Sequence, residues 1–215
     1  MTVRLVVFDA DGTLTQHSSI WWRLHEVFGT TREGKLYYDR FFAGEITYDE
    51  WADLDAALWK GRPLSIVEQV VRETELVPGA KETVSELHNA GIRTAILSGG
   101  LDILANDISR RLGIDYVLTN RLIHRDGVLT GEVESLVGWG DKHRAVRTIA
   151  KHFGVSLRDT AFVGDGRNDV SAMAVVGLAI AFMPETEEVA RAADVVVREN
   201  DLRAILPHVI SEGPR

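Results

Sequence analysis

Acidic and hydroxyl side chains follow directly after three short apolar runs of the sequence. Asp9 and Asp11 follow the first run, Ser98 follows the second, and Asp165 and Asp169 follow the third. Like charges repel one another and Asp is a poor strand former, so paired carboxylates at the end of a buried strand need a physical reason. A hard divalent cation supplies one, because Mg²⁺ prefers oxygen ligands and commonly takes one or two carboxylates together with a substrate phosphate.

Groups that suit a phosphate accompany these acids. Lys142 opens a predicted helix and can place a positive charge on a phosphate. The Ser98 hydroxyl and the backbone amides of Gly99 and Gly100 can donate hydrogen bonds to its oxygens. Positioning and charge neutralisation are what phosphoryl transfer requires. We therefore expect one site that uses Mg²⁺ and acts on a phosphorylated compound.

These residues can meet only if the strands that precede them lie side by side. From residue 78 onward, short apolar runs alternate with amphipathic segments. Such alternation is typical of right-handed βαβ units whose parallel sheet carries helices on both faces, and the carboxyl ends of neighbouring strands then converge on one crevice. We predict an α/β fold with a doubly wound, mostly parallel, Rossmann-like sheet.

Periodicity and turn residues locate the individual elements. After an apolar first strand that ends at Phe8, the predicted strands are Arg93–Leu97, Tyr116–Leu118, Thr160–Val163, Leu178–Phe182 and Val195–Val197, with a hairpin over Arg121–Val133 that turns at Asp126 and Gly127. The predicted helices are Lys81–Ala90, Leu101–Leu112, Asp141–Phe153, Asp169–Val176, Glu185–Ala192 and Leu202–Ile210.

Residues 16–77 show no convincing strand and are predicted to form a small all-helical cap over the strand ends, where such sheets bind ligands. The predicted helices are Ile20–Phe28, Gly34–Phe42, Thr47–Lys60 and Ser65–Glu75. Two of them begin with capping boxes, Thr47 with Glu50 and Ser65 with Glu68. The predicted domains are therefore a Rossmann-like catalytic core of residues 1–15 and 78–215 and an inserted cap of residues 16–77.

Composition bounds the class of protein. The 215 residues can hold one core plus a small insertion, and a hydrophobic content of 45% with 26% charged residues is ordinary for a soluble globular protein. The sequence shows neither an apolar stretch near the ~20 residues of a membrane helix nor a signal peptide, and it contains no Cys for disulfides or thiolate sites. The net charge of -8 disfavours a nucleic-acid surface. We expect a cytoplasmic protein, monomeric or homodimeric, whose partner is a small phosphorylated metabolite and not a nucleic acid or a membrane.

Other interpretations of single features fit less well. The segment Gly164–Asp169 lacks the ligand spacing of an EF-hand calcium loop, and its Gly164-x-Gly166 pair does not open the first βα unit as a dinucleotide-binding motif should. The histidines show no paired metal-ligand spacing and are interpreted as surface or boundary residues, although His17 and His25 could line the crevice under the cap.

Taken together, the motifs resemble a known family. DADGT, Ser98 with Gly99 and Gly100, Lys142, and GDGRND resemble the four motifs of the haloacid dehalogenase superfamily. The stretch SGGLDILANDISRRLGIDYVLTNRLIHRDGVLTGEV is similar to the corresponding part of its phosphoserine phosphatase branch. The resemblance covers nearly the whole chain and implies a Mg²⁺-dependent phosphatase.

The resemblance also implies a role for each acidic residue of the motifs. Asp9 would be the nucleophile that forms an aspartyl-phosphate. Asp11 would protonate the leaving oxygen, then take a proton from the hydrolytic water, with its backbone carbonyl on Mg²⁺. Asp165 would complete the protein ligands of the metal, and Asp169 would support them from outside.

The remaining motif residues would bind the phosphoryl group. The resemblance implies that Ser98 and Lys142 hold it, that Lys142 also orients the nucleophile, and that Asn168 and the amides of Gly99 and Gly100 assist. Two alternatives stay open at this point. One is a phosphotransferase that passes the phosphoryl group to an alcohol, and the other is a catalytically silent phosphate-binding module.

The cap departs from the pattern of the phosphoserine phosphatase branch. Members of that branch hold the substrate amino group with a Glu after the first motif and the carboxylate with an Arg in the cap, whereas Ser18 and Asp55 occupy these two positions here. Asp would repel a carboxylate. Arg23, Arg40 or Arg62 could compensate. We expect Ser18 and Asp55 to bind substrate and the usual amino-acid clamp to be replaced.

Asp55 lies one helical turn from both Trp51 and Trp59. An acid between aromatic rings suits an ammonium-bearing alcohol phosphate such as phosphocholine or phosphoethanolamine, as an alternative to phosphoserine. The competing interpretation is that the two Trp residues pack the small core of the cap and that Asp55 is a solvated surface acid.

Overall fold

The computed structural model describes residues 2–17 and 19–210. Within these residues, seven strands form one sheet in the order β4-β3-β2-β1-β5-β6-β7. The strands are β1 Leu5–Phe8, β2 Arg93–Leu101, β3 Tyr116–Arg125, β4 Val128–Glu134, β5 Thr160–Gly164, β6 Leu178–Phe182 and β7 Val195–Val197. Neighbouring strands run parallel except for β3 and β4, which are antiparallel. The predicted fold class, an α/β protein with a mostly parallel Rossmann-like sheet, is confirmed.

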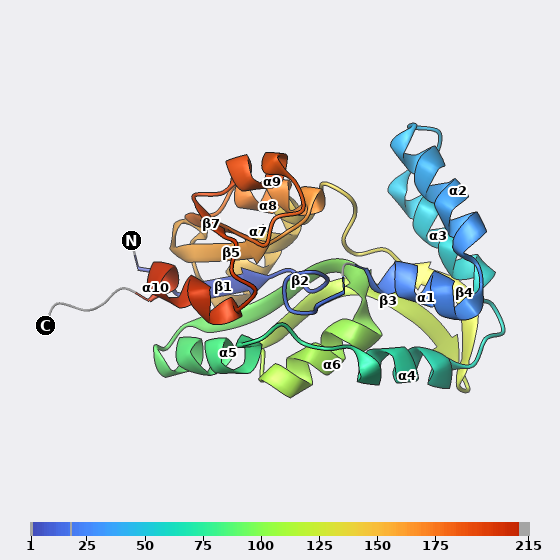
Figure 1. The fold of residues 1–215 in the computed structure, drawn as a ribbon, viewed down its shortest axis with the longest axis horizontal. Coiled ribbons are helices and arrows are strands. Elements are labelled where there is room, and N and C mark those ends of the chain that lie inside the picture. The colour runs from blue at the N-terminus through green and yellow to red at the C-terminus, as the bar shows by residue number, and fades with distance from the viewer. Residues whose placement is uncertain (1, 18, 211–215) are drawn as a thin grey trace, which may run out of the picture.

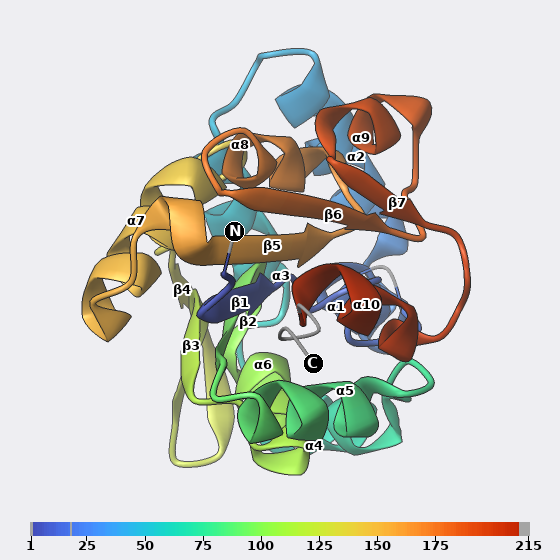
Figure 2. The same ribbon diagram turned by 90° about the vertical axis from the view of Figure 1, so that its left-hand side faces the viewer.

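The central strand β1 shows why the sheet is covered on both faces. All four of its residues are buried, and side chains on a strand alternate between the two faces. Leu5 and Val7 pack in one apolar cluster with residues of α7 (Lys142–Phe153), α8 (Val170–Met173) and α9 (Glu187–Ala192). Val6 and Phe8 pack in the other cluster with residues of α5 (Ala80–Asn89), α6 (Asp102–Leu112) and α10 (Leu206–Val209). Figure 2 shows these two groups of helices on opposite sides of the sheet.

Two predicted helices begin with a 3₁₀ turn in place of a regular α-helical turn. The predicted helix Asp169–Val176 begins instead as a 3₁₀ turn, Arg167–Asp169, followed by the single turn of α8. The carboxylate of Asp169 explains the turn, since it accepts hydrogen bonds from the backbone N–H groups of residues 165 and 166. The predicted helix Leu202–Ile210 likewise begins as a 3₁₀ turn, Leu202–Ile205, before α10.

The predicted hairpin is present, but its first strand is longer than expected. β3 is one continuous strand from Tyr116 to Arg125, so the short predicted strand and the hairpin arm are the same element. Asp126 and Gly127 connect it to β4 with φ values of 52° and 76°, the left-handed region that a tight hairpin turn requires.

Four helices lie between β1 and α5, as the sequence predicted. They are α1 Ile20–Phe28, α2 Thr31–Phe42, α3 Tyr48–Leu58 and α4 Leu64–Glu73, and we call them the helical insertion. Figure 1 shows α2 and α3 projecting together from the rest of the molecule, while α4 lies beside α6. Leu24, Trp59 and Val70 belong to the same apolar cluster as Phe8 of the sheet. The insertion therefore shares its apolar packing with the sheet. None of the described helices is long and apolar enough to cross a bilayer.

One of the two predicted capping boxes forms. The Thr47 side chain accepts from the backbone N–H of Glu50, and Glu50 accepts from the backbone N–H of Thr47 at 2.7 Å. The predicted box of Ser65 with Glu68 is wrong. α4 begins one residue earlier, directly after Pro63, which occupies the N-cap position with an extended backbone, and no side chain caps it.

Candidate active site

The strand register brings the three predicted strand ends together. Phe8, the last residue of β1, lies beside Ile96 of β2 and Val163 of β5. The residues that follow are therefore neighbours in space although they are far apart in sequence. β2 continues through Ser98 to Leu101 with an irregular register, and Ser98 Oγ accepts from the backbone N–H of Gly100 at 2.9 Å.

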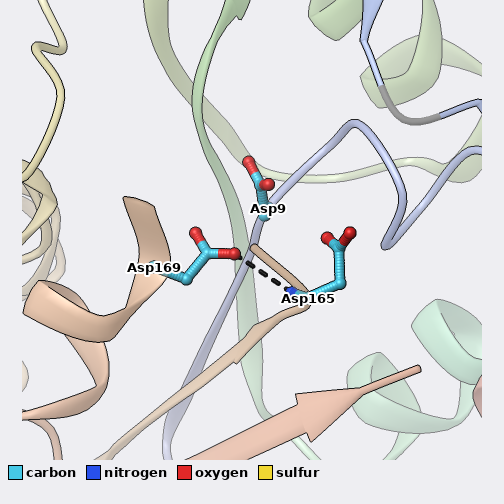
Figure 3. Close-up of side chains that lie close together, drawn as sticks. All are labelled: Asp9, Asp165 and Asp169. Atoms are coloured by element: carbon cyan, nitrogen blue, oxygen red, sulfur yellow. Dashed lines mark hydrogen bonds between the residues drawn. The ribbon is translucent and has the colours of Figure 1, made fainter. Parts of the chain in front are cut away.

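Three buried carboxylates meet at these strand ends. One carboxylate oxygen from each of Asp9, Asp165 and Asp169 lies within 4.8 Å of the others, and Figure 3 shows the three side chains together. Asp165 is held by the Thr13 hydroxyl, which donates to its Oδ1 at 2.7 Å. Asp169 Oδ2 accepts from the backbone N–H groups of Asp165 and Gly166, each at 3.0 Å. Asp165 and Asp169 are thus fixed by hydrogen bonds that do not depend on a ligand.

Lys142 is the cation of this cluster. Its Nζ lies 2.8 Å from Asp9 Oδ1 and 2.6 Å from Asp169 Oδ1, and the side chain is 1% exposed. Burial alone lowers the pKa of the Lys142 ammonium, but the carboxylates of Asp169 and Asp9 outweigh it and hold the pKa above its usual range. Lys142 therefore keeps its charge and orients Asp9.

One lysine does not balance the acids around it. Burial, followed by the charges of Asp9 and Asp169, raises the pKa of Asp165 to about 9. Burial, followed by the charge of Asp9, also raises the pKa of Asp169 to about 6 and that of Asp11 to about 7. These directions mean that the carboxylates resist sharing the site as anions. The all-oxygen donor set and its surplus of negative charge fit a hard divalent cation.

Asp11 lies beside the triad and faces the same space. Its Oδ1 accepts from the backbone N–H of Ile20 at 3.0 Å, which ties it to the start of α1. A Cβ atom at position 100 would lie 2.6 Å from Asp11 Oδ2, so Gly at this position avoids a clash with the Asp11 side chain.

A cavity of about 370 Å³ opens over these residues. Its lining includes most of the predicted site residues, namely Asp9, Asp11, Ser98, Gly99, Gly100, Asp165, Asn168 and Asp55. Lys142 and Asp169 lie buried behind the lining. Ser18 lies outside the described residues. The structure thus brings together every described residue of the predicted site.

Comparison with known proteins identifies the family. The model of the haloacid dehalogenase-like hydrolases matches residues 6–174. The chain belongs to this family. Phosphoserine phosphatase of Methanocaldococcus jannaschii is 37% identical over 209 residues, covering 96% of this chain and 97% of the relative.

Two solved structures agree with this haloacid dehalogenase-like assignment. One is described as a phospho-aspartyl intermediate analogue of phosphoserine phosphatase (TM-score 0.84, 35% identity). The other is described as a substrate-bound phosphoserine phosphatase complex (TM-score 0.85, 34% identity). Each alignment covers 98% of this chain and 100% of the other. These relatives confirm the predicted family, its phosphoserine phosphatase-like branch and the class of haloacid dehalogenase-type phosphatase.

At the far side of its cavity, this haloacid dehalogenase-like chain holds a buried acid. Asp55 is 3% exposed, so its interpretation as a solvated surface acid is wrong. His25, also interpreted as a surface or boundary residue, is 2% exposed, and its Nε2 lies 3.2 Å from Asp55 Oδ1. Both residues line the cavity together with Trp51, whereas Trp59 packs in the apolar cluster. Burial raises the pKa of the Asp55 carboxyl.

The arginines named as possible compensating residues for the amino-acid clamp point elsewhere. Arg23 pairs with Glu26, Arg40 with Glu45, and Arg62 donates to the backbone oxygen of Phe28. None of the three lines the cavity, and among the described residues the lining contains a single arginine, Arg167. His17 is exposed and does not line it either.

Several residues of the site gave no signal in the sequence. Buried Asn120 accepts from the backbone N–H groups of Leu136 and Val137 through Oδ1 and donates through Nδ2 to Tyr48 Oη and the Gly99 carbonyl. Trp21 also donates to the Gly99 carbonyl. Thr13 on Asp165 and exposed Glu185 in the lining were missed as well. Thr13 lies within the first motif and has no charged group, so the sequence carries no separate signal for its role. Nothing local marks Asn120, since its partners lie on other segments.

Proposed function

We propose that the protein is a Mg²⁺-dependent phosphatase that hydrolyses a small phosphomonoester through an aspartyl-phosphate on Asp9. The observation that carries this proposal is the arrangement of Asp9, which lines the cavity while Lys142 holds its Oδ1 at 2.8 Å. A carboxylate fixed in this way is positioned for in-line attack on phosphorus. Such a nucleophile divides one difficult displacement into two easier ones.

In the first step, a carboxylate oxygen of Asp9 forms a bond to phosphorus while the bond from phosphorus to the ester oxygen breaks. Asp11 gives its proton to the departing alcohol. In the second step, water attacks phosphorus, Asp11 takes a proton from that water, and the Asp9–phosphorus bond breaks to release phosphate. Ser98, Lys142, Asn168 and the amides of Gly99 and Gly100 hold the phosphoryl oxygens throughout.

Asp9, the backbone carbonyl of Asp11 and Asp165 would hold the metal. Asp169 supports this set, because both of its oxygens are engaged by Lys142 and by two backbone amides. When bound, Mg²⁺ would neutralise charge on the phosphoryl group and help to orient it. The surplus of buried carboxylates over cations supports this assignment.

The substrate would bind between the helical cap and the core. Residues 16–77 act as the cap that selects the substrate, above a core of residues 1–15 and 78–215. The enzyme is phosphoserine phosphatase-like, but Ser18 and Asp55 replace the usual amino-acid clamp, and the substrate is a small phosphorylated metabolite. Phosphoserine phosphatase is the name that its relatives carry. The buried acid at Asp55 favours an ammonium-bearing alcohol phosphate such as phosphocholine or phosphoethanolamine. A monomer or homodimer in the cytoplasm remains our expectation.

The test is phosphate release from p-nitrophenyl phosphate. We expect turnover with Mg²⁺, none with a chelator, and none for Asp9→Asn, while Asp126→Asn at the exposed hairpin turn retains the wild-type rate. An inactive wild type would favour the silent phosphate-binding module. Transfer of phosphate to an added alcohol faster than to water would favour the phosphotransferase.

A further inference from the structure

Four buried side-chain atoms in the described part of the chain lack a well-aligned hydrogen bond, and all four belong to residues that line the cavity. One is Asp9 Oδ1, at the reaction centre, which forms the ion pair with Lys142 Nζ. The other three are His25 Nε2, Trp51 Nε1 and Asp55 Oδ1, on α1 and α3 of the helical insertion, and His25 Nε2 lies 3.2 Å from Asp55 Oδ1. Burying a carboxylate is costly unless hydrogen bonds compensate it. The Asp55 carboxylate, with one imidazole beside it, can accept further hydrogen bonds from a polar group of the ligand.

The hydrogen bonds around His25 indicate the charge of this site. Thr30 Oγ1 accepts from Trp59 Nε1 at 3.3 Å and lies 2.8 Å from His25 Nδ1. If the single hydroxyl proton of Thr30 points to Nδ1, every proton of this group has an acceptor. His25 then presents the N–H of Nε2 to the Asp55 carboxylate. That carboxylate is the acidic group at this end of the cavity.

The cavity that Asp55 lines has many aromatic walls. The lining includes Trp21, Trp22, Tyr38, Tyr48, Trp51 and Trp139. The faces of aromatic rings attract cations, and no lysine is among the described lining residues. A buried acid in an aromatic-lined cavity therefore attracts a positive group and repels a carboxylate.

We propose that the Asp55 end of the cavity binds a primary ammonium group of the substrate, so that the preferred substrate is the phosphomonoester of a small amino alcohol without a carboxylate. This inference rests on the proposed phosphatase function and names its substrate class. A primary ammonium can donate N–H hydrogen bonds to the Asp55 carboxylate, whereas a quaternary ammonium has no N–H group to donate. A cavity of about 370 Å³ lies near the lower end of the range of small-molecule sites, about 300–1,000 Å³, which suits a short substrate.

The first test is a substrate panel on the wild-type enzyme with Mg²⁺. The matched pair is 2-aminoethyl phosphate and 2-hydroxyethyl phosphate, which differ in the ammonium group, with phosphocholine and O-phosphoserine as the other arms. We expect kcat/KM for 2-aminoethyl phosphate to exceed that of each other compound by about ten-fold or more, the size typical of losing one buried charged contact. Equal turnover of the matched pair, or faster turnover of phosphocholine or O-phosphoserine, would overturn the proposal.

The second test places the selectivity at Asp55. Asp55→Asn removes the charge at nearly constant volume and is expected to reduce the amino-to-hydroxy ratio of kcat/KM at least about ten-fold. Asp53→Asn removes an exposed charge from the same helix and is expected to leave that ratio within about two-fold of wild type. An unchanged ratio in Asp55→Asn would contradict the proposal, and if that variant does not fold, the wild-type panel still decides.

The panel also separates this inference from the proposed function. p-Nitrophenyl phosphate has no ammonium group and reports on the reaction alone. Turnover of this compound without preference within the panel would leave the phosphatase in place and remove the ammonium site. Absence of turnover of every compound would instead overturn the proposed function.

Discussion

Lys142 and Asp169 are 27 residues apart in the sequence, yet Lys142 Nζ lies 2.6 Å from Asp169 Oδ1 and both side chains are buried. Asp169 is in turn fixed by two backbone amides. The lysine is therefore held in a single position, from which it also reaches Asp9. This contact links the start of α7 to the turn after β5 and keeps Asp9, the proposed nucleophile, at the edge of the cavity.

Removing the lysine charge should destabilise the fold. Lys142→Met keeps most of the volume but leaves Asp9 and Asp169 buried without their cation, which should lower the free energy of unfolding by about 3–5 kcal/mol. Urea unfolding at neutral pH measures this change. Lys151→Met, at an exposed position of the same helix, should change it by less than about 0.5 kcal/mol. Equal stabilities of the two variants would show that the ion pairs do not support the fold.

The sequence predicted the ends of β1 and β5 well because their information is local, whereas β2, predicted to end at Leu97, continues to Leu101. Each of Asp9, Ser98 and Asp165 follows an apolar run, and the geometry of parallel sheets converts this into proximity. Glycine residues after helices and the Asp126–Gly127 turn also predicted where elements end, because their signals are local too.

The contacts between distant segments were not predictable from one sequence. In the sequence, Asn120 is an ordinary polar residue of a strand. Its role comes from the backbone N–H groups of residues 136 and 137, which donate to its side chain after the chain has folded. The pairing of His25 with Asp55 joins α1 to α3, and the residue spacing within either helix cannot predict a contact between the two helices. The helix predicted over Asp169–Val176 failed because the Asp169 side chain competes for backbone amides.

Metal binding should be visible in stability. The wild type should unfold at a higher temperature with Mg²⁺ than with a chelator, since a ligand of the native state at about 100 times its Kd adds about 2.7 kcal/mol. Asp165→Asn should lose this response. It should also be more stable than wild type without metal, because one of three converging carboxylates has lost its charge. Thermal melts with and without Mg²⁺ test both statements, with Asp126→Asn as a control that should respond like wild type. A full Mg²⁺ response in Asp165→Asn would contradict the assigned metal ligand.

Two glycines with similar backbones should differ sharply. Gly12 and Gly29 have φ values of 81° and 70°, so Ala at either position should cost about 1–2 kcal/mol of backbone strain. A Cβ at Gly12 would also overlap Asp165 Oδ2, whereas one at Gly29 meets nothing within 4 Å. Gly12→Ala should therefore be the less stable variant in urea and should lose the thermal response to Mg²⁺, and Gly29→Ala should keep that response. Matching melts for the two variants would show that Asp165 can move aside without consequence.

Asn120 should hold the segment that leads into α7. Asn120→Ala leaves the buried N–H of Val137 and the neighbouring N–H of Leu136 without their acceptor, and a buried unsatisfied group costs about 1–3 kcal/mol. It also frees Tyr48 Oη and the Gly99 carbonyl from the Asn120 amide. We expect a lower free energy of unfolding and a reduced kcat toward p-nitrophenyl phosphate, because the residues before Lys142 lose their anchor. Asn89→Ala, at an exposed helix end, is the control for urea unfolding and kinetics and should match wild type in both. Wild-type stability in Asn120→Ala would mean that these amides find another partner and that Asn120 does not position the site.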